Sequence, residues 1–469
     1  MHREITEMKF YGGKWMSFFP FGIFIAITIY IVTLGVPDIR GMWVAALLGI
    51  MLTYFLSKEK SNYYLVIIEG MADKIAIVPV VAWIFAGVFA TVLKESGLVE
   101  GIIWAAYHTG VNGTTFIVIT FFVSALFATI TGTGFGTIIA GMAVLYPAGV
   151  LLGGDPILLA GAIVSGGAFG DNLAPISDTT IASAATQGVD VSGVVKSRIK
   201  YVIPSGIITL AFIMFFGKSG EVQSVPYEII SASMNPVGLV MIFPALLTIF
   251  LAVKGAHLVS ATTVGTIVGV ITAILFKLTS FSSLLYIKEG KVEGIFVDGI
   301  AGMIDISILA LLLMAIVNIM RVGGGDKALI GLTEKVITTA RGAEMSIASL
   351  ILAMCAVMGL NSPAILAIGL PFARPIGEKF KISPYRTANV LDALSCTVIY
   401  LLPWGSGLLL VQLGAADVNE KFGDIVPALT SSQVAPWVIY SWALLAVMIF
   451  AILTGWGRTM VDKKSETIG

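Results

Sequence analysis

The sequence predicts an all-α protein that crosses a membrane many times and consists of two inverted repeats with broken helices. Hydrophobic residues make up 57% of the chain and charged residues only 12%, whereas soluble domains usually carry about 25% charged residues. Apolar runs recur from end to end, and most are long enough to cross a bilayer. Glycine, proline and polar residues interrupt these runs at matching places in the two halves, which is typical of repeat-built transporters.

The apolar runs define the expected membrane helices. They cover 19–35, 42–56, 76–93, 115–130, 137–153, 157–170, 200–217, 236–253, 258–276, 300–320, 343–360, 364–377, 387–411 and 436–455. Shorter runs beside residues 131, 170, 361 and 397 are candidates for half-helices or re-entrant segments. We interpret the first run as a membrane helix, because it has no small-residue site of the kind at which a signal peptide is cleaved.

An internal match divides the chain into an N-terminal repeat (1–217), an extracytoplasmic linker (218–235) and a C-terminal inverted repeat (236–469). The halves align at an offset of about 230 residues, with Gly70-Met-Ala-Asp73 opposite Gly302-Met-Ile-Asp305. The breaks near 131 and 361 also correspond. Two halves that carry interrupted hydrophobic segments at the same places indicate a secondary transporter.

Loop charges predict the orientation of these repeats in the cell membrane. Lysines and arginines collect on the cytoplasmic side of membrane proteins. The residues that can be placed on one side are Lys58, Lys60, Lys74, Lys196, Arg198, Lys200, Arg321, Lys327, Lys335, Arg341, Arg458, Lys463 and Lys464. This placement puts both termini in the cytoplasm and the start of the second half outside. The segments 61–70 and 282–287 are each either an interfacial amphipathic helix or an ordinary loop.

Composition and spacing also argue against several other functions. A net charge of zero, without a basic patch, makes nucleic acid an unexpected partner. Cys355 and Cys396 lie in apolar runs and lack CxxC spacing, so we interpret them as core residues. Three scattered histidines form no ligand cluster, and no nucleophile–base pair indicates an enzyme or a bound cofactor. The expected partners are membrane lipid and a transported solute.

The stretch from Asp171 to Thr180 is the strongest candidate for a binding site. Ionisable groups at membrane depth usually persist only where they bind an ion, a substrate or each other. Carboxylate, amide and hydroxyl oxygens are ligands for hard cations such as sodium, and Pro175 leaves a nearby carbonyl unpaired. The alternative is that Ser177 or Asp178 caps a helix. The candidate cation ligands are Asp171, Asn172, Ser177, Asp178, Thr179 and Thr180, with Asp171 and Asp178 as the charged sodium ligands.

Two further breaks are candidates for the same site. The segment Thr131-Gly132-Thr133-Gly134-Phe-Gly-Thr137 has three glycines, which suit an unwound segment that exposes backbone to a ligand. Close packing of helices through small residues is the alternative. Asn361-Ser362-Pro363 would be its counterpart, although a single proline can simply kink a helix.

The second half supplies a partner for the Asp171 motif. Asp392, Ser395 and Thr397 are the candidate residues, and Asp392 and Ser395 share a helical face. Asp305 lies among apolar residues near the start of a helix and is the candidate for a buried proton carrier.

These motifs resemble the NhaC-type sodium/proton antiporter family. Gly-Ala-Phe-Gly-Asp171-Asn-Leu-Ala-Pro-Ile-Ser-Asp178-Thr-Thr180 is similar to the family signature. Thr131–Thr137 resembles its Thr-Gly-Thr-Ser-Trp-Gly-Thr element, and Leu402-Pro-Trp404 resembles its Ile-Pro-Trp. The resemblance implies the fold of the broader ion-transporter superfamily: inverted repeats, helical hairpins, a scaffold and a mobile transport domain, in a chain that is often a homodimer.

One departure from the family pattern leaves two functions open. Antiporters of this family commonly have lysine after the first aspartate, where this chain has Asn172. The resemblance implies sodium/proton exchange in which sodium, the coupling ion, and protons compete for Asp171 and Asp178, with Asp392 contributing. The alternative is sodium- or proton-coupled transport of an amino acid or small organic acid. A channel is a third class, but no continuous polar-lined helix indicates one.

Overall fold

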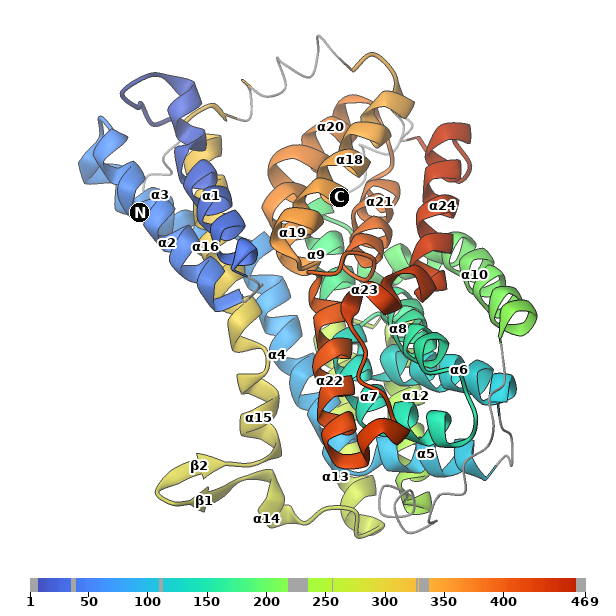
Figure 1. The fold of residues 1–469 in the computed structure, drawn as a ribbon. Coiled ribbons are helices and arrows are strands. Elements are labelled where there is room, and N and C mark those ends of the chain that lie inside the picture. Colours follow the sequence, from blue (N-terminus) through green and yellow to red (C-terminus); the bar gives the residue numbers. More distant parts are fainter. Residues whose placement is uncertain are drawn as a thin grey trace.

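The protein is built almost entirely of helices, as the sequence predicts (Figure 1). It is described here by a computed structural model, which covers residues 7–34, 39–108, 113–217, 235–254, 256–325, 328 and 337–460. Within these ranges, seven helical segments are long and apolar enough to cross a membrane, and up to eight if one bent pair of helices near the C-terminus forms a single span. The polytopic membrane architecture is therefore confirmed.

The N-terminal part packs tightly against a helix of the second half. It comprises η1 (Lys14–Phe18), α1 (Phe19–Thr33), α2 (Ile39–Leu56), α3 (Lys60–Met71) and α4 (Lys74–Glu95). The segment 61–70 is helical and belongs to α3, and it is not a loop. A Cβ atom at Gly70 would lie 2.7 Å from the carbonyl oxygen of Met314. Glycine at this position therefore lets α3 pack directly on α16 (Ile304–Val322).

The rest of the first repeat contains a helical hairpin and two further helices around a break. The elements are α5 (Leu98–Tyr107), α6 (Gly113–Thr131), α7 (Gly134–Leu151), α8 (Pro156–Leu173), α9 (Asp178–Gln187) and α10 (Val191–Phe216). The N–H of Gly113 donates to the carbonyl oxygen of Leu152 at 3.0 Å, so α6 starts where α7 ends. The two helices therefore form a hairpin whose tip is the Thr131–Gly134 break.

The second half begins with helices and a small β-hairpin. The elements are η2 (Pro236–Met241), α12 (Ile242–Val253), α13 (Leu258–Leu275), α14 (Phe281–Leu284), β1 (Tyr286–Lys288), β2 (Lys291–Glu293) and α15 (Ile295–Ala301). Segment 282–287 is therefore neither an interfacial helix nor an irregular loop, because the short α14 leads into β1. Ile287 pairs with Val292, and Glu289 and Gly290 both have positive φ, which suits a two-residue hairpin turn.

The C-terminal part repeats the pattern of hairpin and broken helix. It comprises α18 (Ala340–Met358), α19 (Ser362–Ile368), the π-helical turn η3 (Gly369–Ala373), α20 (Arg374–Lys379), α21 (Pro384–Val398), α22 (Ser406–Phe422), η4 (Gly423–Ile425), α23 (Ser431–Val434), η5 (Ala435–Trp437) and α24 (Ile439–Thr454). The apolar run 387–411 is not one helix. It breaks between α21 and α22, where Pro403 lies and where Gly405 packs on the backbone of Ile399.

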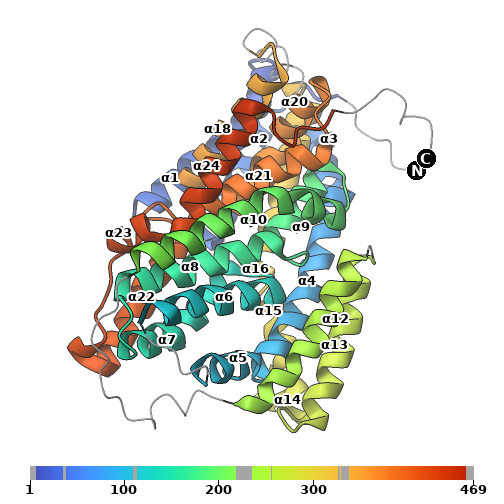
Figure 2. The ribbon, with the colours of Figure 1, turned by 90° about the vertical axis from the view of Figure 1, so that its right-hand side faces the viewer.

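The helices fall into two groups (Figures 1 and 2). In one group α4 packs with α13, α15 and α16, and α16 also packs with α2 and α3. In the other group α8 packs with α6, α7, α10 and α24, and α21 packs with α18 and α24. The groups meet where α9 contacts α4 and where α19 contacts α16. This arrangement fits the expected scaffold and transport domain.

Part of the expected organisation lies outside the described residues. The linker falls there except for Asn235, as do Lys327, Lys335, Lys463 and Lys464. The repeat boundaries and the cytoplasmic location of the termini stay predictions. One observation bears on the sides of the membrane. The candidate span Ile295–Val322 starts at the β-hairpin and ends at Val322, whose carbonyl oxygen accepts the N–H of Met8 at 3.0 Å.

The β-hairpin and the N-terminal segment should therefore lie on opposite sides of the membrane, with the hairpin outside. We expect Glu289→Cys to react with an impermeant maleimide on intact cells, and Lys58→Cys to react only after permeabilisation. Cys355 and Cys396 are buried, so background labelling should be low. The reverse pattern would contradict cytoplasmic termini.

Candidate functional site

The break between α8 and α9 carries the polar motif of the first repeat. Residues 174–177 are not helical, and Pro175 lacks the N–H that would continue the helix. Asp171 lies in the last turn of α8, and Asp178 opens α9. The two carboxylates therefore stand on either side of an unwound segment in a buried part of the protein.

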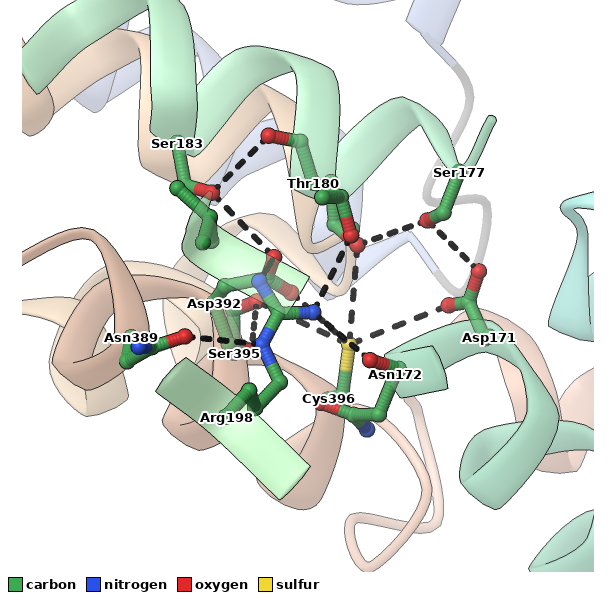
Figure 3. Close-up of polar contacts among 12 residues, drawn as sticks. Asp171, Asn172, Ser177, Thr180, Ser183, Arg198, Asn389, Asp392, Ser395 and Cys396 are labelled. Carbon is green, nitrogen blue, oxygen red and sulfur yellow. Dashed lines mark hydrogen bonds and ion pairs between the residues drawn. The ribbon is translucent and has the colours of Figure 1, made fainter. Parts of the chain in front are cut away.

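Asp171 is buried and contacts Ser177 and Cys396 (Figure 3). The Ser177 hydroxyl donates to its Oδ1 at 2.7 Å and lies 2.9 Å from the Thr179 hydroxyl. The Cys396 thiol lies 3.8 Å from its Oδ2. Asp171 thus contacts both its own motif and a helix of the second repeat.

Asp178 joins the breaks of the two repeats. Its Oδ1 accepts the N–H of Thr179 at 2.9 Å, and its Oδ2 accepts the hydroxyl of Ser362 at 2.5 Å. Ser177 occupies the N-cap position of α9 but makes no side-chain cap bond. Helix capping therefore accounts for one carboxylate oxygen of Asp178, which accepts an N–H of α9. It does not account for Ser177, whose hydroxyl donates to Asp171.

Asp392 forms a buried ion pair with Arg198 of α10 (Figure 3). The same guanidinium donates to the Thr180 hydroxyl at 3.0 Å, to the carbonyl oxygen of Asn172 at 2.9 Å and to Oδ1 of Asn389 at 2.9 Å. Both charged side chains are completely buried. Arg198 therefore links the motifs of the two repeats.

The assignment of Arg198 to the charges of the cytoplasmic surface is wrong. The side chain is enclosed because it lies on the buried face of α10, together with Val194, Tyr201, Ser205 and Thr209. That spacing of three or four residues is the signal that marks the inner face of a helix. Lys196 and Lys200 flank Arg198 in the sequence, and positive charge alone does not distinguish the inner residue from its neighbours.

The other candidates of the second half contribute less directly. The Ser395 and Thr397 hydroxyls donate to carbonyl oxygens of their own helix, at 2.8 and 2.6 Å. Cys396, interpreted from the sequence as a core residue, instead lies among the carboxylates, 3.8 Å from Oδ1 of Asp392. Ser183 of α9, which the sequence analysis missed, donates to Oδ2 of Asp392 at 3.1 Å.

The Thr131–Gly134 tip of the first hairpin reaches the same region. Gly132 has a φ of +71°, and a Cβ atom there would lie 2.5 Å from the side chain of Ile176, inside the α8–α9 break. Thr133 caps α7 by accepting the N–H of Gly136 at 3.2 Å, and the Thr131 hydroxyl donates to its own helix. The backbone of the tip therefore packs against the α8–α9 break. The side chains of Thr131 and Thr133 instead form hydrogen bonds within α6 and α7.

The counterpart break also meets the cluster. The Oδ1 of Asn361 accepts the N–H of Ser362 at 2.9 Å, and its amide nitrogen lies 3.8 Å from the Cys396 sulfur. Both Asn361 and Ser362 are buried. Breaks from both repeats therefore converge on one centre.

The expected burial of Asp305 is wrong. Its side chain is 42% exposed and pairs with Arg40, which is 68% exposed, at 3.6 Å. Apolar neighbours in the sequence do not bury it, because it stands in the first turn of α16 at the surface of the helix bundle. Asp305 is not part of the carboxylate cluster.

Comparisons with known proteins agree with this geometry. A model of the Na⁺/H⁺ antiporter family matches residues 8–218 and 221–456. The chain belongs to the Na⁺/H⁺ antiporter family. It is 26% identical to the Na⁺/H⁺ antiporter NhaC of Alkalihalophilus pseudofirmus over 75% of this chain and 79% of that one. It is also 26% identical to the malate-2H⁺/Na⁺-lactate antiporter of Bacillus subtilis, over 69% and 72%.

A solved structure shows the same fold. MtrF of Neisseria gonorrhoeae, described as representing a class of antimetabolite efflux pumps, superposes with a TM-score of 0.58 at 13% identity, over 85% of each chain. This likeness extends to the fold alone. The family match, and not this likeness, shows that the protein is a secondary transporter.

The carboxylate cluster of this antiporter-family protein contains more carboxylates than cations. Asp171, Asp178 and Asp392 converge on a single cation, Arg198, which pairs with Asp392. Among the described residues, no group of three or more His, Cys, Asp or Glu side chains is arranged to hold a metal ion. A sodium ion beside Asp171 or Asp178 would therefore need hydroxyl or backbone oxygens as its other ligands, and Ser177 and Thr179 are close by.

Asp178→Asn separates cation binding from capping. The amide keeps an oxygen for the N–H of Thr179 but removes the charge, so the fold should survive and sodium-dependent thermal stabilisation should be lost. The matched control is Asp190→Asn. Asp190 is an N-cap of α10 that accepts the N–H of Gly193 at 2.6 Å and the hydroxyl of Tyr385.

We expect the Asp190 variant to keep its sodium response. Burial alone would raise the pKa of Asp190, but the hydrogen bonds from Tyr385 and Gly193 outweigh burial and lower that pKa. The charge of Asp190 therefore stabilises the N-cap of α10. A sodium response like that of the wild type in Asp178→Asn would remove Asp178 from the site.

Proposed function

We propose that the protein exchanges sodium ions for protons at the cluster of Asp171, Asp178, Asp392 and Arg198. The observation that supports this most is the charge imbalance, since three carboxylates share one guanidinium, with Asp171 and Asp392 buried and Asp178 partly buried. Unpaired charges in a low-dielectric interior are costly unless they are balanced or neutralised. A bound sodium ion balances the charge of such a carboxylate, and a bound proton neutralises it. Sodium and protons therefore compete for Asp171 and Asp178.

Arg198 is proposed to supply the fixed positive charge of the site. Family members commonly have lysine at the position of Asn172, next to Asp171. Here the backbone carbonyl of Asn172 accepts a hydrogen bond from Arg198 instead. A guanidinium from α10 therefore contacts the backbone of this position, and it pairs with Asp392, leaving Asp171 and Asp178 for exchangeable ions.

The group of helices that includes α8, α9, α10 and α21 is proposed to move as the transport domain. The three carboxylates and Arg198 all lie in this group. A cavity of about 290 Å³ lies between it and the other group, lined by Val78 and Ala82 of α4, Ile181 and Ala184 of α9, and Asp190. Since Asp178 lies one turn before Ile181, this cavity is the proposed access route for ions.

Sodium-coupled transport of a small organic acid or amino acid is the second candidate function. One relative is named as a malate-2H⁺/Na⁺-lactate antiporter. The chain also has a buried tyrosine hydroxyl, that of Tyr400, which has no partner among the described residues and lies beside the hairpin tip. A hydrogen-bond donor is available there for a ligand other than a cation.

Proteoliposomes with an imposed sodium gradient and an internal pH probe test the function directly. Exchange predicts a pH change driven by sodium alone, and it should be lost when Asp171→Asn and Asp178→Asn are combined. A labelled panel of amino acids and carboxylates covers the second candidate. Sodium-dependent accumulation of one of these without any pH change would overturn the exchange proposal.

The Arg198–Asp392 pair should show strong coupling in stability. Arg198→Gln or Asp392→Asn alone leaves a buried charge unpaired, which typically costs about 3–5 kcal/mol. The double variant removes both charges and should recover much of this loss. Thermal or denaturant unfolding of the four purified proteins measures the coupling. Additive losses in the double variant would show that the two side chains do not act as a pair.

A further inference from the structure

A second binding subsite lies beside the carboxylate cluster, at the tip of the α6–α7 hairpin. We propose that the N-terminus of α7 and the hydroxyl of Tyr400 together bind the carboxylate of a small monocarboxylic acid. The proposal goes beyond sodium/proton exchange and rests on the proposed sodium site only for its dependence on sodium.

The first observation is the hydroxyl of Tyr400. The side chain is completely buried, and its oxygen has no hydrogen-bond partner within the described ranges. A buried hydroxyl without a partner is destabilising, and phenylalanine at this position would avoid that cost. The Tyr400 hydroxyl is therefore a hydrogen-bond donor that is available to a bound ligand.

The second observation is the uncapped start of α7. Thr133 satisfies the N–H of Gly136, and the N–H of Thr137 bonds to the carbonyl oxygen of Thr133 at 3.4 Å. The N–H groups of Gly134 and Phe135 have no acceptor in the described part of the chain. They stand at the positive end of an 18-residue helix, where amide donors and the helix dipole favour an anion.

The third observation is that these donors are close together and held in place. The Tyr400 hydroxyl is the nearest atom to a Cβ that would be added at Gly134, so any side chain there would overlap it. Gly407 packs against the other part of the tyrosine ring, and the ring of Phe135 lies 5.9 Å from it, centroid to centroid. The Tyr400 hydroxyl thus lies against the first residue of α7, whose free N–H groups are the other donors of the proposed subsite.

Electrostatics make this subsite dependent on sodium. Asp171 and Asp178 lie close enough to Tyr400 to interact with its hydroxyl electrostatically, and their negative charges oppose an anion. Sodium at the carboxylates removes that opposition, so the anion should bind after the cation. Full burial limits the ligand to a few heavy atoms, and two carboxylate oxygens can accept from the tyrosine and one amide together. Acetate and lactate are suitable probes.

The test is thermal unfolding of the purified protein titrated with acetate or lactate, in sodium and in choline. We expect both acids to raise Tm in sodium only, and Tyr400→Phe to weaken this effect at least tenfold while the response to sodium alone persists. The matched control is Tyr440→Phe. Tyr440 is equally buried and its hydroxyl also lacks a partner in the described chain, but its ring packs on Phe169 of α8. Its variant should respond like the wild type.

Each other outcome is decisive. Sodium stabilisation without any carboxylate effect overturns the subsite and leaves the sodium site standing. Loss of the response to sodium alone in Tyr400→Phe makes the hydroxyl a cation ligand and also overturns it. An equal effect of chloride at matched ionic strength contradicts a carboxylate subsite. Absence of any sodium response in the wild type counts against the proposed exchange function instead.

Discussion

The structure depends on how buried charge is balanced at the meeting point of the two repeats. Arg198 pairs with Asp392, whereas buried Asp171 and partly buried Asp178 have no ion-pair partner among the described residues. A second buried network shows the opposite balance, because Glu344 pairs with both Arg386 and Arg458 at 2.8 Å. That network needs no mobile ion to compensate its carboxylate, and it ties α18 and α21 to the segment after α24. Of these two networks, only the one at the broken helices has an excess of carboxylates.

The broken helices follow from this requirement. A carboxylate in a membrane needs hydroxyl and backbone oxygens around an ion, and regular helices have already used their backbone groups internally. Unwinding at 174–177 and at the 131–134 and 359–361 tips frees such groups next to the carboxylates. Two repeats contribute in complementary ways: the first supplies Asp171 and Asp178, and the second supplies Asp392, Cys396 and the Ser362 hydroxyl that holds Asp178.

Local sequence predicted the breaks and the carboxylates because glycine, proline and charge are conspicuous in apolar runs. It could not predict Arg198 or Tyr400, because each comes from a helix or turn whose role is decided by packing against distant segments. The same limit explains Asp305, where apolar neighbours suggested burial but the turn lies at the surface. The break between α21 and α22 is expected from the short run beside residue 397, but the packing of Gly405 against the backbone of Ile399 becomes visible only in the structure.

Proton release on sodium binding tests the central claim most directly. The purified protein is held in weakly buffered solution with a pH indicator, and sodium is added against a choline control. Two carboxylates without a fixed cation should release protons as sodium binds, so we expect acidification that saturates with sodium and disappears when Asp171→Asn and Asp178→Asn are combined. Sodium-dependent stabilisation without any release of protons would contradict competition of the two ions for these carboxylates.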